Sequence, residues 1–94
     1  MIVQITRKQT ENRTHIPYKL CEFVLGCEPK FIRKFVKEGV LDMSLYGKKR
    51  YFNIDELESF SSSWKKGLEE KNIFIYDYET VRERAEFIAS LPVL

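Results

Sequence analysis

A very short turn between two helical patterns constrains this chain more than any other feature of its sequence. Apolar residues recur at helical spacing over residues 17–25, and Gly26 then ends the pattern. A second pattern occupies residues 29–39 and opens with Pro29, which suits the first position of a helix. Because only residues 26–28 separate the two patterns, the sequence predicts two short helices that meet at an angle.

The second of these helices separates its basic side chains from its apolar ones. At about 100° per residue, Lys30, Arg33, Lys34 and Lys37 lie on one side, and Phe31, Ile32, Phe35 and Val36 lie on the other. Like charges at i and i+4 repel by roughly 0.2–0.5 kcal/mol per pair, and nothing on that side is predicted to offset the repulsion. A solvated surface is the ordinary interpretation. The alternative is a polyanionic ligand, which would neutralise these charges and release counterions.

Charge is divided unevenly along the 94 residues, although their net charge is only +2. Residues 29–54 contain seven basic and two acidic residues, a net charge of +5. Residues 55–94 contain five basic and nine acidic residues, a net charge of −4. This division indicates an anionic partner for the middle of the chain.

Two further elements follow the basic helix. Residues 42–53 predict a small β-hairpin with basic residues at its tip. A third helix is predicted over residues 54–64, with Asn53 and Glu56 as a capping pair at its start. Its apolar stripe would consist of Leu57, Phe60 and Trp64.

The two ends of the chain give weaker patterns. Residues 1–15 are mostly polar and fit a short edge strand or a flexible arm, with partial disorder favoured. Residues 72–78 are apolar and predict a strand or an extended segment. A last helix is expected up to about residue 90, starting at a capping pair formed by Thr80 and Glu83. Its apolar face would hold Val81, Ala85 and Ile88.

The sequence contains no recognisable catalytic set, metal site or cofactor motif. Two cysteines, Cys21 and Cys27, together with the single His15 cannot supply the four ligands of a structural zinc site. Both cysteines are interpreted as small buried residues. There is no glycine-rich phosphate-binding loop. We therefore expect neither enzymatic activity nor a cofactor.

The middle of the chain resembles a known family of DNA-binding domains. The residues that carry the resemblance are Leu25-Gly26-Cys27-Glu28-Pro29-Lys30, Val36-Lys37-Glu38-Gly39 and Leu41, followed by Gly47-Lys48-Lys49-Arg50-Tyr51-Phe52 and Asp55-Glu56-Leu57-Glu58-Ser59-Phe60. In their order and spacing they are similar to the MerR superfamily, especially its small excisionase-like members. The resemblance implies an α+β, mostly helical, winged helix-turn-helix with a short C-terminal extension. Residues 1–16 would then be a polar arm, residues 17–66 the winged domain and residues 67–94 the extension.

The resemblance also implies which side chains touch DNA. The helix that begins at Pro29 would enter the major groove, and the hairpin would touch the backbone beside it. The candidate DNA-binding residues are Lys30, Phe31, Arg33, Lys34 and Lys37 of the helix and Lys48, Lys49, Arg50 and Tyr51 of the hairpin. A guanidinium such as that of Arg33 can bind guanine in bidentate fashion, whereas lysines more often hold phosphates.

Three candidate positions leave alternatives open. Glu28 stands where the family usually has serine or threonine, and its carboxylate would repel a phosphate. Phe31 replaces a small polar residue, so it belongs either to the core or against a thymine methyl group. Tyr51 either packs across the hairpin or contacts a phosphate.

Two classes of function remain from the sequence. The first is a sequence-specific double-stranded DNA-binding protein, either a small transcriptional regulator or an excisionase-like recombination accessory factor from a phage or mobile element. Its extension would either complete the core or contact a second copy, an integrase or another protein. The second is a protein-interaction module, such as a phage or plasmid inhibitor, that keeps the winged-helix shape; a packaging-motor subunit is a related option. No apolar run approaches the roughly 20 residues of a membrane span, so a cytoplasmic, nucleoid-associated location is expected.

Overall fold

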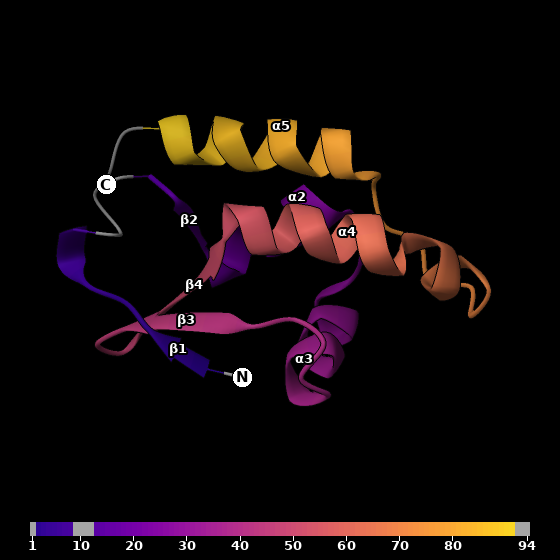
Figure 1. Ribbon diagram of the computed structural model, residues 1–94, viewed down its shortest axis with the longest axis horizontal. Coiled ribbons are helices and arrows are strands. Elements are labelled where there is room, and N and C mark those ends of the chain that lie inside the picture. Colours follow the sequence, from indigo (N-terminus) through magenta and orange to yellow (C-terminus); the bar gives the residue numbers. More distant parts are fainter. Residues whose placement is uncertain (1, 9–12, 92–94) are drawn as a thin grey trace.

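The computed structural model describes residues 2–8 and 13–91 and has an α+β fold (Figure 1). The strands are β1 (Ile2–Gln4), β2 (His15–Pro17), β3 (Met43–Tyr46) and β4 (Lys49–Asn53). The helices are the 3-10 helix η1 (Tyr18–Leu20), α2 (Cys21–Leu25), α3 (Pro29–Lys37), α4 (Ile54–Glu69) and α5 (Tyr78–Ser90). The α+β class expected from the sequence is confirmed.

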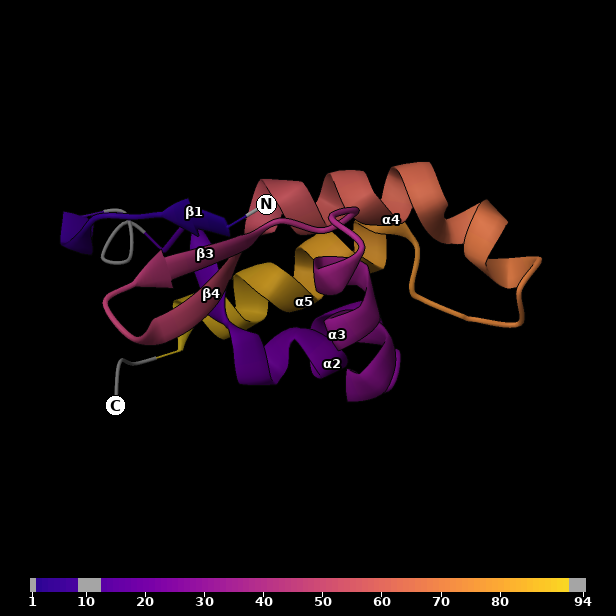
Figure 2. The same cartoon turned by 90° about the horizontal axis from the view of Figure 1, so that it is seen from below.

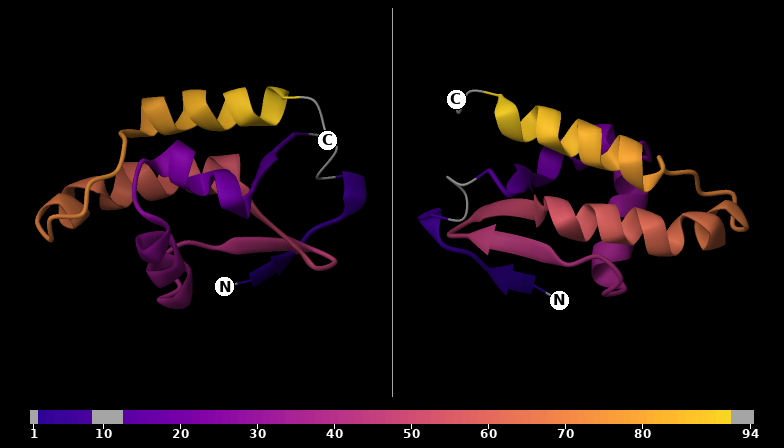
Figure 3. Two further views of the ribbon diagram at one scale, coloured as in Figure 1. Left: turned by 180° about the vertical axis from the view of Figure 1, so that it is seen from behind. Right: turned by 45° about the horizontal axis from the view of Figure 1, so that its top comes forward.

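The four strands form one mixed sheet in the order β1-β3-β4-β2. β3 and β4 are the predicted hairpin, and the turn between them contains Gly47 at a φ of 61°. β2 pairs antiparallel with the outer edge of β4, and β1 pairs parallel with β3 (Figure 3). The hairpin is therefore the centre of the sheet and has a strand on each side.

The start of the chain differs from the expectation of partial disorder. Ile2–Gln4 is the edge strand β1, and Ile5 is buried with its N–H donating to the carbonyl of Leu45 at 2.8 Å. His15 and Ile16 are buried in β2. These apolar side chains find sequence-distant partners on the hairpin, which the polar composition of the segment did not reveal. Residue 1 and residues 9–12 lie outside the described residues.

The two short helices α2 and α3 meet at the predicted turn, but the first helix begins differently. Pro17 was expected to open a helix; instead it lies opposite Tyr51 at the end of β2, and η1 precedes α2. Gly26 ends α2 with a φ of 79°, and Gly39 follows α3 with a φ of 78°. Both angles lie in the left-handed region that glycine adopts without steric cost.

α4 starts where expected and ends later. The side chain of Asn53 accepts a hydrogen bond from the backbone N–H of Glu56 at 3.1 Å, which confirms the predicted cap. The helix was expected to end at about Trp64, but it continues to Glu69. Ser61 is buried and donates from its hydroxyl to the carbonyl of Tyr76 at 2.5 Å, so tertiary contacts outweigh its low helix propensity. Trp64 was predicted to belong to the apolar stripe of this helix, but its side chain is 44% exposed and lies outside the core.

Residues 73–77 connect α4 to α5 as an extended segment without regular pairing. Ile73 and Ile75 are buried, and Phe74 and Tyr76 are exposed. The cap of α5 is Asp77, which accepts from the N–H of Thr80 at 2.9 Å, rather than Thr80 itself. This hydrogen bond lowers the pKa of Asp77.

α5 lies antiparallel along α4 and closes one side of the molecule (Figures 1 and 3). A single cluster of buried apolar side chains joins this layer to the sheet and to the α2–α3 pair. Its largest members include Ile16, Leu25, Phe35, Leu41, Phe52, Leu57, Phe60 and Val81. The helix of the predicted extension therefore shares one core with the α2–α3 pair.

Candidate nucleic-acid interface

The apolar side of α3 attaches this helix to the core. Ile32 and Phe35 are buried, and the Phe35 ring lies 5.0 Å from the ring of Phe60 on α4. Phe31 and Val36 are partly buried against the same cluster. Because this side is anchored, the opposite side of α3 must face outward, as the sequence predicted.

All four basic residues of α3 are exposed, but two of them have acidic neighbours. Lys30 Nζ lies 3.4 Å from Glu28 Oε2, and Lys34 Nζ lies 3.9 Å from Glu38 Oε1. The expectation that nothing offsets the repulsion on this side is therefore wrong for these two lysines. Both ion pairs are more than half exposed, and such pairs contribute little to stability.

Arg33 and Lys37 differ from these two lysines. Both are exposed one turn apart on α3, and neither forms an ion pair with any residue that the structure describes. Like charges at this spacing repel. They are the two cations of α3 that remain available to an external anion.

The three basic residues of the β3–β4 hairpin lie in two different environments. Lys48 lies in the turn and Lys49 begins β4, and both are exposed. Arg50 instead folds back over the ring of Tyr18, with its guanidinium carbon 4.4 Å from the ring centre. Tyr18 in turn stacks on the buried Phe52 at 5.1 Å. A cation–π contact of this kind holds the guanidinium in place without neutralising it.

Arg50 and the start of α3 border the same shallow hollow. Its lining residues are Tyr18, Lys19, Glu22, Pro29, Ile32 and Arg50. The structure thus brings one hairpin cation close to the helix, whereas Lys48 lies farther along the hairpin. Lys19, on η1, also borders this hollow and was not among the predicted residues. Only the pairing of β2 with β4 places it there, and the sequence carried no signal of that pairing.

α3 and the hairpin lie on the side of the molecule away from α5 (Figures 1 and 2). Tyr51 is half-buried and lies opposite Ser44 and Pro17 in the sheet. Since side chains alternate along a strand, Tyr51 projects from the other sheet face than Arg50. Of the two alternatives for Tyr51, packing across the sheet fits this position better.

The acidic half of the chain does not cover the basic surface. Arg82 of α5 lies within 2.5 Å of Asp55, 3.2 Å of Glu58 and 3.8 Å of Glu86. These carboxylates, Asp55 by its hydrogen bond above all, raise the pKa of Arg82. Part of the acidic charge is thus paired within the α4–α5 layer, and the basic side of α3 stays open.

The cysteines are buried and free, as predicted. Burial, followed by the negative charge of Glu22, raises the pKa of Cys27 to about 11, and burial also raises the pKa of Cys21. Neither thiol is therefore ionised near neutral pH, which makes both poor nucleophiles. In the described part of the chain, no three His, Cys, Asp or Glu side chains are grouped as metal ligands would be.

Comparison with protein-family models, with curated proteins and with solved structures finds no match to this chain. Among the described residues, none of the helices has the length and apolar character needed to span a lipid bilayer. Function is therefore inferred from the sequence and from the chemistry of the exposed surfaces.

Proposed function

We propose that this protein binds double-stranded DNA as a winged helix-turn-helix, with α3 in the major groove and the β3–β4 hairpin against the adjacent backbone. The observation that carries the proposal is the pair Arg33 and Lys37, which are exposed and form no ion pair with a described residue, on a helix whose other side is anchored in the core. A helix of this width fits the major groove of B-form DNA. The short turn before α3 makes it the second helix of the pair, the position of a recognition helix.

The side chains divide into two roles. Arg33 is assigned to base reading, because its guanidinium can bind guanine O6 and N7 together. The lysines of α3 and the hairpin are assigned to phosphates, which set the position of the protein on the duplex. Arg50 is assigned to the flanking backbone, since its stacking on Tyr18 limits the entropy that binding would cost.

Duplex DNA fits this surface better than single-stranded nucleic acid. Single-strand binding uses exposed aromatic rings beside the cations as stacking platforms. Here Phe35 is buried, and Phe31 is partly buried with Lys30 Nζ 5.1 Å from its ring centre. The cellular role that we propose is a small transcriptional regulator or a recombination accessory factor of a phage or mobile element.

Charge removal on α3 tests the proposal. We expect Arg33→Ala with Lys37→Ala to lower duplex affinity at least tenfold in an electrophoretic mobility assay, since one base contact and one phosphate contact are lost. For the unchanged protein, neutralising about five phosphates predicts a slope near −4 to −5 in a plot of log affinity against log salt. The double variant should reduce the magnitude of this slope by about 1, because only Lys37 of the two is assigned to a phosphate.

The matched control is Lys66→Ala with Lys71→Ala, which removes two exposed cations beyond α3 and the hairpin. This control should retain most of the affinity. Equal losses in both double variants would reduce the effect to net charge and contradict a specific interface. A flat salt slope for the unchanged protein would instead favour the protein-interaction module.

A further inference from the structure

The sheet has one open edge, and strand β1 forms it. In the order β1-β3-β4-β2, β1 pairs with β3 on one side only, and all of its residues are exposed (Figure 3). The opposite edge is closed in two ways. β2 ends at Pro17, which has no N–H to donate, and α5 contacts β2. Arg13, just before β2, also donates from Nη1 to the carbonyl of Ser90 at 3.4 Å. The fold therefore protects β2 from pairing with another strand and leaves β1 open.

Backbone groups of β1 point alternately toward β3 and toward the open side. The N–H of Ile5 donates to the carbonyl of Leu45 at 2.8 Å, and in a parallel pair every second residue bonds to the same neighbour. Val3 therefore also bonds to β3, whereas the N–H and carbonyl groups of Ile2 and Gln4 point away from it. On that side, Ile2 and Gln4 form no backbone hydrogen bond with a described residue. The edge thus offers both donors and acceptors to an extended strand.

The side chains of this edge are uncharged and largely apolar. Ile2 is 56% exposed and Val3 is 40% exposed, and adjacent residues of a strand project from opposite faces of the sheet. Residues 2–6 contain no charged residue and no proline. Native proteins commonly place such residues on open edges, where they prevent pairing with other chains. β1 lacks this protection, so its edge is suited to pairing.

A second copy of the same strand matches this edge. In an antiparallel pair with a two-fold axis at Val3, Ile2 lies opposite Gln4 of the second copy, and Gln4 lies opposite its Ile2. Each of these two pairs exchanges two hydrogen bonds, about four in total, so every outward-facing backbone group of the two residues is satisfied. The two Val3 side chains lie opposite each other on the axis, and β-branched pairs of this kind stabilise a sheet. Since β1 carries no charge, two copies meet without repulsion, whereas a charged segment finds no complementary charge on it.

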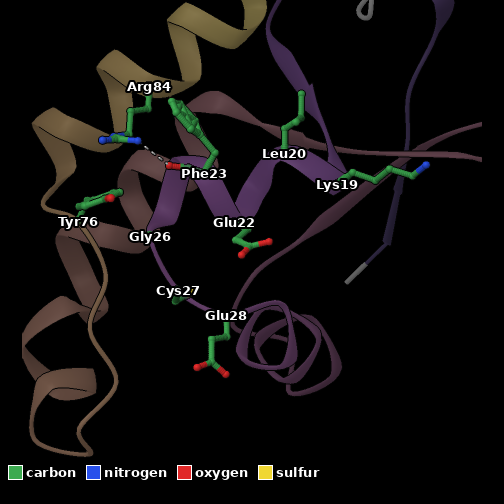
Figure 4. A pocket seen from close by; sticks show the side chains of 9 residues that line it. All are labelled: Lys19, Leu20, Glu22, Phe23, Gly26, Cys27, Glu28, Tyr76 and Arg84. Atoms are coloured by element: carbon green, nitrogen blue, oxygen red, sulfur yellow. Dashed lines mark hydrogen bonds between the residues drawn. The ribbon is translucent and has the colours of Figure 1, made fainter.

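The exposed aromatic side chains between α2 and α5 are less suited to a partner. Arg84 already lies between the rings of Phe23 and Tyr76, with its guanidinium carbon 4.5 Å from each ring centre (Figure 4). It also donates a hydrogen bond to the carbonyl of Phe23 at 3.4 Å. Lys19 and Glu22 both border the hollow beside Tyr76, so charges of both signs lie there. That surface is occupied by a cation of its own and specifies no partner, whereas the backbone of β1 specifies an extended strand.

We propose that two copies of this protein pair through β1, so that their sheets join into one continuous sheet across a two-fold axis. The interface is isologous, since the same residues of both copies form it. Because only three residues of each strand pair, the interface is smaller than that of a stable dimer, and the copies associate reversibly at high concentration. The pairing uses no residue of α3, so its failure and the failure of DNA binding are distinguishable.

A cysteine cross-link tests the register. Val3→Cys should give a disulfide-linked dimer on mild oxidation of the full chain, because opposite residues at the axis have Cα atoms roughly 4.5 Å apart. Gln4→Cys is the matched control on the same exposed strand. Its counterpart in the second copy does not lie opposite and is farther away than the roughly 7 Å that a disulfide can bridge. The native Cys21 and Cys27 are buried and do not compete. On a non-reducing gel, the dimer fraction of Val3→Cys should exceed that of the control roughly tenfold.

A backbone variant tests the hydrogen bonds. Gln4→Pro removes an N–H that points away from β3, so it should abolish the dimer and keep the hydrogen bonds between β1 and β3. Gln4→Ala keeps this N–H and should associate like the unchanged protein. Sedimentation velocity at roughly 10 µM to 1 mM measures the association, and thermal melting verifies that each variant is folded.

Three outcomes would overturn the proposal. The first is an unchanged protein that stays monomeric at every concentration. The second is equal cross-linking of Val3→Cys and Gln4→Cys, which would exclude an axis at Val3. The third is a dimer that Gln4→Pro leaves intact, since the contact would then lie elsewhere on the molecule.

Discussion

α3 and α5 are both amphipathic surface helices, yet they carry their charges in opposite ways. On α5, Arg82 forms ion pairs with two carboxylates of α4 and with one of α5 itself. On α3, Arg33 and Lys37 meet no carboxylate among the described residues. Ion pairs thus connect α5 to α4, whereas α3 is held by the buried Ile32 and Phe35, with Phe31 and Val36 partly buried beside them.

This difference shows that the two oppositely charged halves of the chain do not neutralise each other. A fold in which the acidic end covered the basic helix would have explained the charge division without any partner. Instead α5 lies on the opposite side of the molecule from α3 (Figure 1), and α4 contacts α3 through Phe60 and the buried Phe35. An exposed set of like charges destabilises a fold slightly, and the proposed duplex ligand would offset this cost on α3.

The largest test of this comparison uses the same substitution on both helices. Phe35→Ala should lower the free energy of unfolding by about 3–5 kcal/mol, because it removes a buried ring that contacts Phe60. Phe87→Ala should lower it by about 1 kcal/mol or less, since that ring is mostly exposed. Urea denaturation measures both. Equal losses would show that α3 and α5 are anchored alike.

A second test concerns the glycines at the ends of α2 and α3. Gly39→Ala should cost about 1–2 kcal/mol, because alanine at a φ of 78° is strained although nothing lies within 4 Å. Gly26→Ala should cost at least about 1 kcal/mol more, because its β-carbon would meet the Tyr76 ring. Thermal melting of the two variants compares them. A smaller loss at Gly26 would mean that Tyr76 moves aside freely.

A third test removes one cation from each helix. Arg82→Met should lower stability by about 1 kcal/mol, because three partly exposed carboxylates lose their partner. Lys37→Met should leave stability unchanged or raise it by a few tenths of a kcal/mol, since a repulsive pair disappears. Denaturation at low and high salt measures both changes. A clear loss for Lys37→Met would reveal an internal role for this lysine.

The last test concerns the joint between α2 and α3. The pKa of Cys27 is raised from 9.0 to about 11 by burial and nearby carboxylates. The unfolded chain therefore loses this proton first, so the stabilising contribution is complete below pH 9 and is lost as the pH rises to about 11. Cys27→Ala should show a shallower decline in stability over this interval. An identical decline would mean that Cys27 is not buried in solution.

The sequence predicted those features of the fold that depend on neighbouring residues. The bounds of α3 follow from Pro29 and Gly39, and the hairpin and the Asn53 cap follow from equally local patterns. The cap of α5 shows the limit of such reasoning. Both Asp77 and Thr80 have a suitable partner three residues later. The structure uses the first of them, Asp77.

The candidate site was predictable in its residues but not in its pairing. Hydrophobic periodicity placed the cations of α3 on the outside, since the apolar face of a short helix must be buried. It did not show that Glu28, which precedes the helix, would approach Lys30. The pair Lys34 and Glu38 has i,i+4 spacing and could have been predicted from the sequence. Nor did it show that the side chains of Tyr51 and Arg50 project from opposite faces of the sheet, which depends on the pleat of β4.

What the sequence determined by itself was the segregation of basic and apolar side chains along residues 29–37 and the turns that bound them. Three features depend on the tertiary structure alone. β1 and β2 flank the hairpin, and the Arg50 guanidinium stacks on the Tyr18 ring. The rings of Phe23 and Phe87 contact each other on one surface. Contacts between segments far apart in the chain depend on which buried faces fit together, and local periodicity contains no information about that choice.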